Sequence, residues 1–136
     1  MVYNVYGHTN GHTEALQAQK TDRIIQAALR DRELTGMAPS VIAGDLNAEV
    51  HDLPAVHNAL QVAGWVDAAA HPCATKGRDG TPLGTCQANG SIKWNRRDYL
   101  LLTPDLAGKL GGVGWTEEHL TRRTNHWLPG CGRAGC

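Results

Sequence analysis

An aspartate and an asparagine two residues apart, Asp45 and Asn47, form the pair in this sequence best suited to chemistry on a bound water molecule. They lie in the segment Gly44-Asp45-Leu46-Asn47-Ala48, directly after a short apolar run. A carboxylate can accept a proton from water while a neighbouring amide orients that water, as hydrolysis of a phosphodiester requires. The structural alternative is that Asp45 and Asn47 form an Asx turn and cap the segment that follows.

The segment that carries Asp45 is expected to be a buried central strand. Residues 40–45 form a short apolar run that is bounded by turn formers and follows a predicted helix. Catalytic groups in layered α/β folds commonly lie just past strand ends, where a rigid backbone presents them to an open cleft. Asp45 is therefore expected at a position where it can meet a ligand.

A strand and a helix are predicted before this segment. Residues 2–6 are strand formers that begin almost at the first residue, which suggests a truncated start. Thr13 is expected to cap a helix that runs to about Leu34, where Gly36 and Pro39 end it.

The remaining elements follow from the same signals. We expect a helix from an Asp52 cap to Gly64, followed by a brief edge strand at 65–67 and a long surface loop at 71–84. A strand at 85–87 and a hairpin of 92–94 with 97–102 are expected next. The last expected elements are a short helix after Pro104 and a weak strand at 110–115. Asp98 then lies inside a strand of the hairpin.

Composition limits the classes of partner. The chain has 136 residues, 41% of them hydrophobic, which is enough for one packed core. Its 13 basic and 13 acidic residues balance, so a broad basic field for nucleic acid is excluded and any affinity for phosphate must be local. The paired arginines at 96–97 and 122–123 are local basic groups, with ordinary solvated surface as the alternative.

The cysteines and the chain start favour an intracellular protein, nuclear or cytoplasmic. No secretory signal or stretch of transmembrane length is visible, and no membrane partner is expected. The cysteines at 73, 86, 131 and 136 lack a paired C-x-x-C framework, which fits reduced thiols. A zinc site built from Cys131 and Cys136 with His119 and His126 is the less favoured alternative.

Three blocks in order resemble the endonuclease/exonuclease/phosphatase superfamily. They are the Val-Tyr strand at 2–6, the Gly-Asp-Leu-Asn-Ala segment at 44–48 and Arg-Arg-Asp-Tyr-Leu-Leu-Leu at 96–102. The superfamily includes pancreatic deoxyribonuclease-like enzymes, apurinic endonucleases and the endonuclease domains of non-LTR retrotransposons, and the last group is the most similar in style. The resemblance extends from residue 2 to about 102.

The resemblance implies roles for four residues of these blocks. Asp45 resembles the aspartate that activates or orients the attacking water, and Asn47 the asparagine that helps to position water and phosphate. Asp98 resembles the aspartate that hydrogen-bonds a late histidine and favours its imidazolium form. For Asp98 the alternative is an ion pair with Arg96 or Arg97 on an edge strand. Tyr6 resembles the tyrosine whose hydroxyl contacts the scissile phosphate; its alternative is a half-buried strand tyrosine.

Further residues match the family pattern less closely. Asn10 resembles an asparagine shortly after the tyrosine, although the spacing is one residue longer and Thr9 competes for the role. Arg97 is expected to bind substrate. His126 falls where the family has a late histidine, but Asn125 precedes it in place of an aspartate. Either this copy is degenerate, or its terminal segment is altered.

The resemblance also implies a metal ion and a missing half. Asp45 is the expected ligand of Mg²⁺ or Mn²⁺, which prefer oxygen donors. Full members have an N-terminal half with an asparagine and a metal-binding glutamate, and neither block precedes Val2. We therefore expect a partial domain at 1–128 and a flexible tail at 129–136, with weak activity for this chain alone.

The expected architecture is a partial two-sheet α/β sandwich with helices outside the sheets and one exposed sheet face. The expected function is metal-dependent hydrolysis of phosphodiester bonds in nucleic acid, most closely a retrotransposon-type DNA endonuclease with a reverse transcriptase in a longer reading frame. Two alternatives stay open: a noncatalytic remnant that binds nucleic acid or a protein, and a phosphatase of small or lipid phosphoesters.

Overall fold

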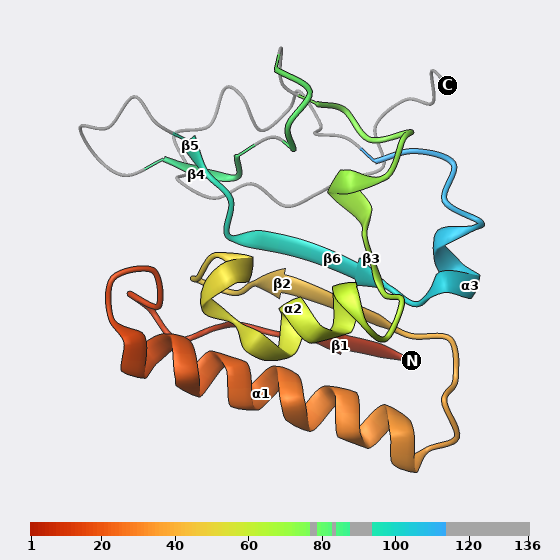
Figure 1. Cartoon of the computed structure of the whole chain (residues 1–136), viewed down its shortest axis with the longest axis horizontal. Coiled ribbons are helices and arrows are strands. Elements are labelled where there is room, and N and C mark those ends of the chain that lie inside the picture. The colour runs from red at the N-terminus through yellow and green to blue at the C-terminus, as the bar shows by residue number, and fades with distance from the viewer. Residues whose placement is uncertain (77–78, 83, 88–93, 114–136) are drawn as a thin grey trace.

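The chain folds around a four-stranded mixed sheet (Figure 1). The computed structural model describes residues 1–76, 79–82, 84–87 and 94–113. The strand order is β1 (Val2–Asn4), β2 (Val41–Asp45), β6 (Asp98–Leu102) and β3 (Val66–Asp67). β1 runs parallel to β2, whereas β6 runs antiparallel to both β2 and β3. β2 and β6 are therefore the inner strands, and their ends fix the position of Asp45 and Asp98.

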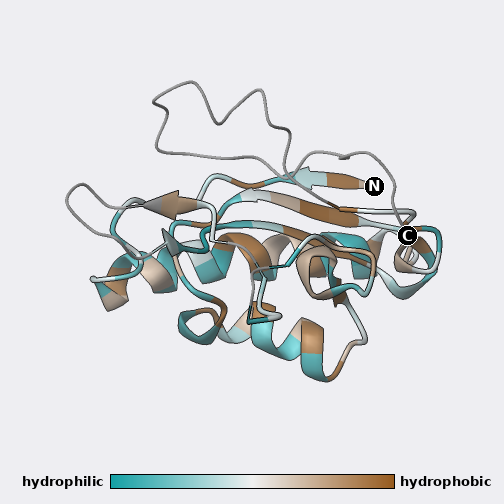
Figure 2. Ribbon diagram, turned by 90° about the horizontal axis from the view of Figure 1, so that it is seen from above, coloured by the Kyte–Doolittle hydropathy of each residue, from teal (hydrophilic) through white to brown (hydrophobic). Residues whose placement is uncertain are grey.

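Two helices cover one face of this sheet, as Figures 1 and 2 show. They are α1 (Ala15–Leu34) and α2 (Pro54–Gln61), which also contact each other. Two 3₁₀ turns, η1 (Val50–Asp52) and η2 (Ala68–Ala70), and the short helix α3 (Pro104–Ala107) complete the helical elements of the described residues. The expected α/β class, a partial sheet with helices outside it, is confirmed.

The main core lies between the sheet and these two helices. Its fully buried side chains include Ile25 of α1, Ile42 of β2, Val56 of α2 and Leu101 of β6. Burying a side chain of this size contributes about 1.5–3 kcal/mol relative to leaving it in water. Four such residues from four different elements therefore hold the helices against β2 and β6.

A buried aspartate joins the two helices. Asp22 of α1 accepts a hydrogen bond from the backbone N–H of Ala55, at 2.7 Å, through one carboxylate oxygen. Its other oxygen accepts from the Gln26 side-chain amide at 2.8 Å. Because Ala55 lies in the first turn of α2, Asp22 of α1 caps the N-terminus of α2.

The opposite face of the sheet carries a smaller apolar cluster and the two carboxylates. Successive side chains of a strand point to opposite faces. Tyr99 and Leu101 belong to the main core, so Asp98 and Leu102 face the other way, and Leu102 indeed packs with Ala68. On the edge strand β1, Val2 is 75% exposed.

The strand at 40–45, the brief strand at 65–67 and the short helix after Pro104 are confirmed by β2, β3 and α3. The predicted caps are wrong. Glu14 precedes α1, and the Thr13 hydroxyl instead donates to the Asn10 carbonyl at 3.1 Å. Asp52 lies in η1, and α2 begins at Pro54 with its first turn bonded to Asp22.

The predicted hairpin of residues 92–94 with 97–102 is also wrong. β5 (Trp94–Asn95) pairs with β4 (Cys86–Gln87), whereas β6 pairs with β2 and β3. Strand propensity does not specify the partner of a strand, and the long apolar β6 is stabilised at the centre of the sheet. No helix among the described residues has the length and apolar character needed to cross a membrane.

Candidate active site

The Asp45–Asn47 turn closes the end of β2 with a bond between its own residues. The Asn47 backbone N–H donates to Oδ1 of Asp45 at 2.8 Å, and Asn47 has a φ of 51°. This bond is the Asx turn that the sequence left open as a structural alternative. Only 8% of Asp45 and 4% of Asn47 is exposed, so the turn holds both polar side chains in a mostly dry environment.

The loop between β1 and α1 packs directly on this turn. The Gly7 N–H donates to the Asp45 carbonyl at 2.7 Å, and the Asn47 side-chain amide donates to the Gly7 carbonyl at 3.1 Å. A Cβ added to Gly7 would lie 2.1 Å from the Leu46 carbonyl oxygen. The close approach therefore requires glycine at this position, and it fixes Tyr6 beside the turn.

Asp98 lies directly opposite Asp45 in the β2–β6 register. It is 2% exposed. The backbone N–H groups of Arg97 and Asp98 both donate to the Thr85 hydroxyl oxygen, at 2.9 and 3.0 Å, and the Leu46 N–H donates to the Arg97 carbonyl at 2.8 Å. Three segments distant in sequence therefore meet at one end of the sheet.

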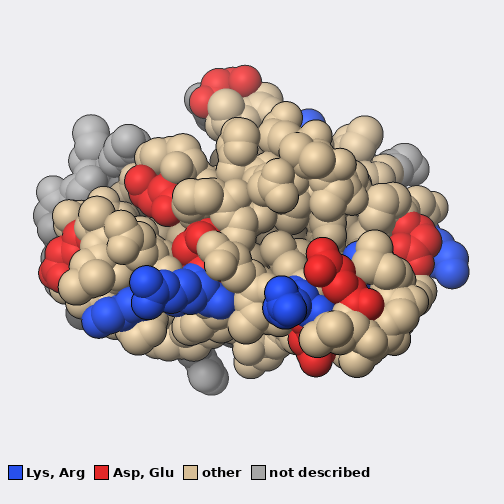
Figure 3. Space-filling model, turned by 60° about the horizontal axis from the view of Figure 1, so that its bottom comes forward, with Lys and Arg blue, Asp and Glu red and all other residues tan. Residues whose placement is uncertain are grey.

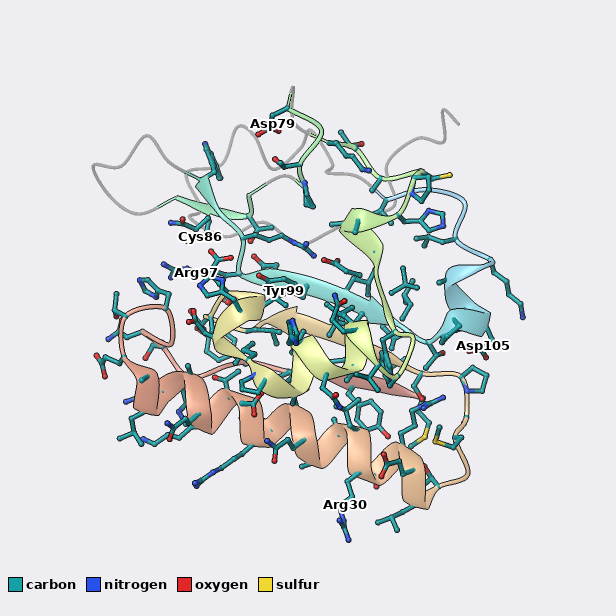
Figure 4. The ribbon with its side chains drawn as sticks, in the orientation of Figure 1. Arg30, Asp79, Cys86, Arg97, Tyr99 and Asp105 are labelled. Carbon is teal, nitrogen blue, oxygen red and sulfur yellow. The ribbon has the colours of Figure 1, made fainter. Side chains whose placement is uncertain are left out.

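The charges of this cluster act on a neighbouring thiol. Burial is the largest effect on the Cys86 thiol, and it raises the pKa of that thiol. The carboxylates of Asp45 and Asp98 also raise this pKa, whereas Arg97 lowers it. Figure 4 shows Cys86 and Arg97 at the same end of β6. Asp45, Asp98 and Arg97 thus act electrostatically on one small region, and we call Asp45, Asn47, Arg97 and Asp98 the carboxylate cluster.

Solved structures with the same arrangement of elements identify the fold. A 3′-5′ exonuclease from Neisseria meningitidis superimposes with a TM-score of 0.65 at 20% identity. An AP endonuclease from Archaeoglobus fulgidus gives 0.62 at 18%, and an endonuclease/exonuclease/phosphatase family protein from Bacteroides thetaiotaomicron gives 0.53 at 13%. Each match covers 94% of this chain. The chain has the endonuclease/exonuclease/phosphatase fold.

The match covers only part of the larger proteins that share this fold. The chain spans 58% of the Neisseria and Archaeoglobus proteins and 47% of the Bacteroides protein. No family model and no curated protein matches the sequence. At these identities the likeness concerns the endonuclease/exonuclease/phosphatase fold alone.

Within this fold, Tyr6 lies at the rim of the carboxylate cluster. It follows β1, and 69% of it is exposed, so the alternative of a half-buried strand tyrosine is wrong. Asn10, with a φ of 66°, directs its side-chain amide to Glu14 at 3.2 Å, while its carbonyl accepts from the N–H groups of Thr13 and Glu14. Asn10 therefore supports the start of α1, and its role in substrate binding stays a prediction.

The arginines before Asp98 have different surroundings. Arg96 forms a bidentate ion pair with Asp67. Its guanidinium carbon, Cζ, lies over the Tyr99 ring, 4.3 Å from the ring centroid. Arg96 thus pairs with Asp67, and the edge-strand part of the alternative for Asp98 is wrong because β6 is an inner strand. The alternative of an ion pair between Asp98 and Arg97 stays open. Arg97 is half-buried, and its Nε has no hydrogen-bond partner among the described residues. His126 and the 129–136 tail lie outside those residues.

Two residues of the site gave no signal in the sequence. The Thr85 hydroxyl accepts from backbone N–H groups that lie 12 and 13 positions later in the chain. The sequence predicted only that a strand begins at this residue. His12 lies in the loop before α1, where burial and then the Arg97 charge lower its pKa, while Glu49 and Asp52 raise it. A polar residue in a loop carries no periodic pattern, so only the packing of the loop reveals it.

The carboxylate cluster has oxygen donors that suit Mg²⁺. The part of the chain that the structure describes contains no group of three or more His, Cys, Asp or Glu side chains placed to hold a metal. Mg²⁺ in phosphate-processing sites commonly uses one or two carboxylates and fills its other positions with water and substrate phosphate. Asp45 as a metal ligand remains a prediction, and Asp98 is its cross-strand neighbour.

Proposed function

We propose that this chain contributes the catalytic carboxylates of a nuclease that hydrolyses phosphodiester bonds in nucleic acid. The observation that supports this function best is the pairing of Asp45 with Asp98, which joins two of the three sequence blocks at one end of the sheet. Two of the solved structures with the same fold are named as an exonuclease and an AP endonuclease. The whole enzyme's activity is a proposal because the chain spans little more than half of those proteins.

In this proposal the residues of the carboxylate cluster divide the work. Asp45 accepts a proton from the attacking water, and Asn47 holds that water and the loop beside it. Asp98 positions a histidine, for which His126 is the candidate, and Arg97 supplies positive charge for a phosphate. Tyr6 contacts the phosphate from the rim, where its ring is exposed.

A divalent cation, Mg²⁺ or Mn²⁺, completes the proposed site. Asp45 would hold it, since a carboxylate is the ligand both ions prefer. When bound, the ion neutralises charge on the phosphate and stabilises the leaving oxygen. The residues of the chain still have to bind, orient and deprotonate the reacting groups.

The more specific proposal is that the substrate is DNA and that the enzyme is a retrotransposon-type endonuclease. This rests on the order of the three sequence blocks, and the reverse transcriptase fused downstream stays a prediction of the same kind. Figure 3 shows Lys and Arg side chains in small groups beside Asp and Glu on the face in view. Binding by a few local groups, rather than by a broad basic field, fits such a surface.

A noncatalytic binding module is the second candidate. In this candidate, the bonds from Asn47 to Asp45 and to Gly7 serve only to hold the turn and the loop beside it. A module that keeps this turn for its fold and lacks the remaining metal ligands would bind nucleic acid without cutting it. The two candidates differ in whether an Asp45 variant loses an activity.

Nicking of supercoiled plasmid in the presence of Mg²⁺ tests the proposal. The chain is compared with Asp45→Ala and with Asp105→Ala, a matched change of an exposed aspartate on α3, at the other end of β6 from Arg97 (Figure 4). We expect nicking by the wild type and by Asp105→Ala, and its loss in Asp45→Ala and in EDTA. Equal rates for all three chains, or no nicking by any of them, would leave the noncatalytic module.

A further inference from the structure

Thr85 is a buried hydroxyl residue that bonds to the chain where β5 leads into β6. It directly precedes β4, and only 1% of it is exposed. Its hydroxyl oxygen accepts from the backbone N–H groups of Arg97 and Asp98, at 2.9 and 3.0 Å. The Thr85 N–H donates to the Asn95 carbonyl at 2.8 Å. Because a hydroxyl oxygen has two lone pairs, the bonds to Arg97 and Asp98 use its full capacity as an acceptor.

The chain passes from one sheet to the other between β5 and β6 (Figure 1). β5 pairs with β4 in the two-stranded sheet, whereas Asp98 begins β6 and pairs with Asp45 in the main sheet. Buried backbone N–H groups at such a crossing need acceptors, and the Thr85 hydroxyl supplies one to both. On the other side, the Leu46 N–H donates to the Arg97 carbonyl at 2.8 Å. The peptide between Arg97 and Asp98 is thereby held from two sides.

We propose that Thr85 is a positioning residue of the nuclease, which acts through Asp98. Its hydroxyl fixes the backbone from which the Asp98 side chain extends, and so holds that carboxylate at the place opposite Asp45. The inference rests on the proposed function, because it needs Asp98 to take part in the reaction. A displacement of about 1 Å in a catalytic group can lower a rate by about a hundredfold. Thr85 therefore affects the rate from a buried position, without contact with the substrate.

Two substitutions separate the hydroxyl of Thr85 from its shape. Valine has nearly the same shape but accepts no hydrogen bond, so Thr85→Val takes the acceptor away from two buried N–H groups. We expect Thr85→Val to lower the rate of plasmid nicking in Mg²⁺ by about a hundredfold, because the peptide that carries Asp98 then shifts. Thr85→Ser keeps the hydroxyl and loses only a methyl group, so it should retain most of the rate.

Thr103→Val is the matched control for a loss of stability alone. Thr103 follows the other end of β6 and is also fully buried, and its hydroxyl oxygen accepts from the Ser40 N–H at 3.0 Å. Both valine variants should unfold at a lower urea concentration than the wild type, since each leaves a buried N–H without its acceptor. Only Thr85→Val should lose nicking per folded molecule. Equal rates per folded molecule for the two valine variants would overturn the inference.

A double variant tests whether Thr85 acts through Asp98. In a chain that already carries Asp98→Asn, Thr85→Val should lower the nicking rate little further, because the carboxylate that Thr85 positions is absent. A merely structural role predicts a second loss of the same size, and that result would overturn the inference. If the wild type does not nick plasmid with Mg²⁺, the proposed function fails and the role of Thr85 fails with it. Nicking that depends on Asp45 but is unchanged in Thr85→Val would reject the inference alone.

Discussion

Asp45 and Asp98 are direct cross-strand partners at the end of the two inner strands, and both carboxylates are almost fully buried. Residues opposite each other in an antiparallel pair have Cβ atoms about 5 Å apart. Two carboxylates brought this close favour a cation or a hydrogen-bond donor beside them, and Arg97 is adjacent in the chain. This pairing joins the Asp45–Asn47 turn, which the sequence predicts to activate water, to the sequence block at 96–102, more than 50 residues later.

Asp98→Asn should abolish most of the nicking while the fold survives. The amide is nearly isosteric with the carboxylate, but it loses the charge that orients and stabilises an imidazolium, so we expect a fall of about a hundredfold or more in rate. Nicking rates and circular dichroism spectra, measured beside Asp79→Asn in an exposed loop, check this. A variant that keeps at least half of the wild-type rate would remove Asp98 from the site.

Gly44→Ala should destabilise the chain strongly, because β1 and β2 approach each other at this residue. Gly44 has a φ of 138°, and an added Cβ would lie 2.0 Å from the Val5 carbonyl oxygen. Backbone strain and the forced separation of β1 together should cost about 3 kcal/mol or more in the free energy of unfolding, measured in urea.

Gly36→Ala is the matched control for that change. Gly36 also has a positive φ, 93°, but nothing lies within 4 Å of an added Cβ. Only the conformational cost remains, about 1 kcal/mol. Equal losses for the two alanine variants would show that the contact of Gly44 with β1 carries no energy of its own.

Breaking the ion pair of Arg96 with Asp67 should loosen the link between β3 and β6. The two side chains are 13% and 11% exposed, so removing one leaves a largely buried charge without its partner. Arg96→Met should cost about 3 kcal/mol, partly through lost contact with the Tyr99 ring. Chemical denaturation of both single variants and the double variant Asp67→Asn/Arg96→Met measures the coupling. Strictly additive losses would contradict a direct interaction.

Alkaline pH should destabilise the chain through Tyr99. Burial is the main cause that raises the pKa of its phenol, so the folded state favours the neutral form. The stability it contributes is present below the ordinary value of 10.0 and is lost as the pH rises above it, by up to about 1.4 kcal/mol per pH unit.

Tyr99→Phe isolates this effect in urea titrations above and below pH 10. The variant lacks the hydroxyl that donates to the Arg96 carbonyl at 3.1 Å, so it should start about 1 kcal/mol less stable at neutral pH. Its unfolding free energy should then fall less steeply in alkali than that of the wild type. Parallel slopes for the two chains would show that Tyr99 ionises without unfolding the core.

Local patterns in the sequence were enough to find the elements that carry the site. The apolar run before Asp45 predicted β2, and helical spacing predicted α1 and α2. Asp45 was expected at the end of an inner strand, and it lies there. The order of three blocks also indicated the fold that the solved structures share with this chain.

The tertiary structure alone decided which of these elements meet. Strand propensity placed 97–102 in a hairpin, but β6 pairs with β2 and thereby puts Asp98 opposite Asp45. The cap of α2 comes from Asp22, 33 residues away, and Thr85 supports Asp98 from 13 residues away. Propensity and periodicity record what one segment prefers by itself, whereas pairing depends on apolar surface buried between distant segments. Hydrogen bonds are then satisfied by whichever groups that burial brings together.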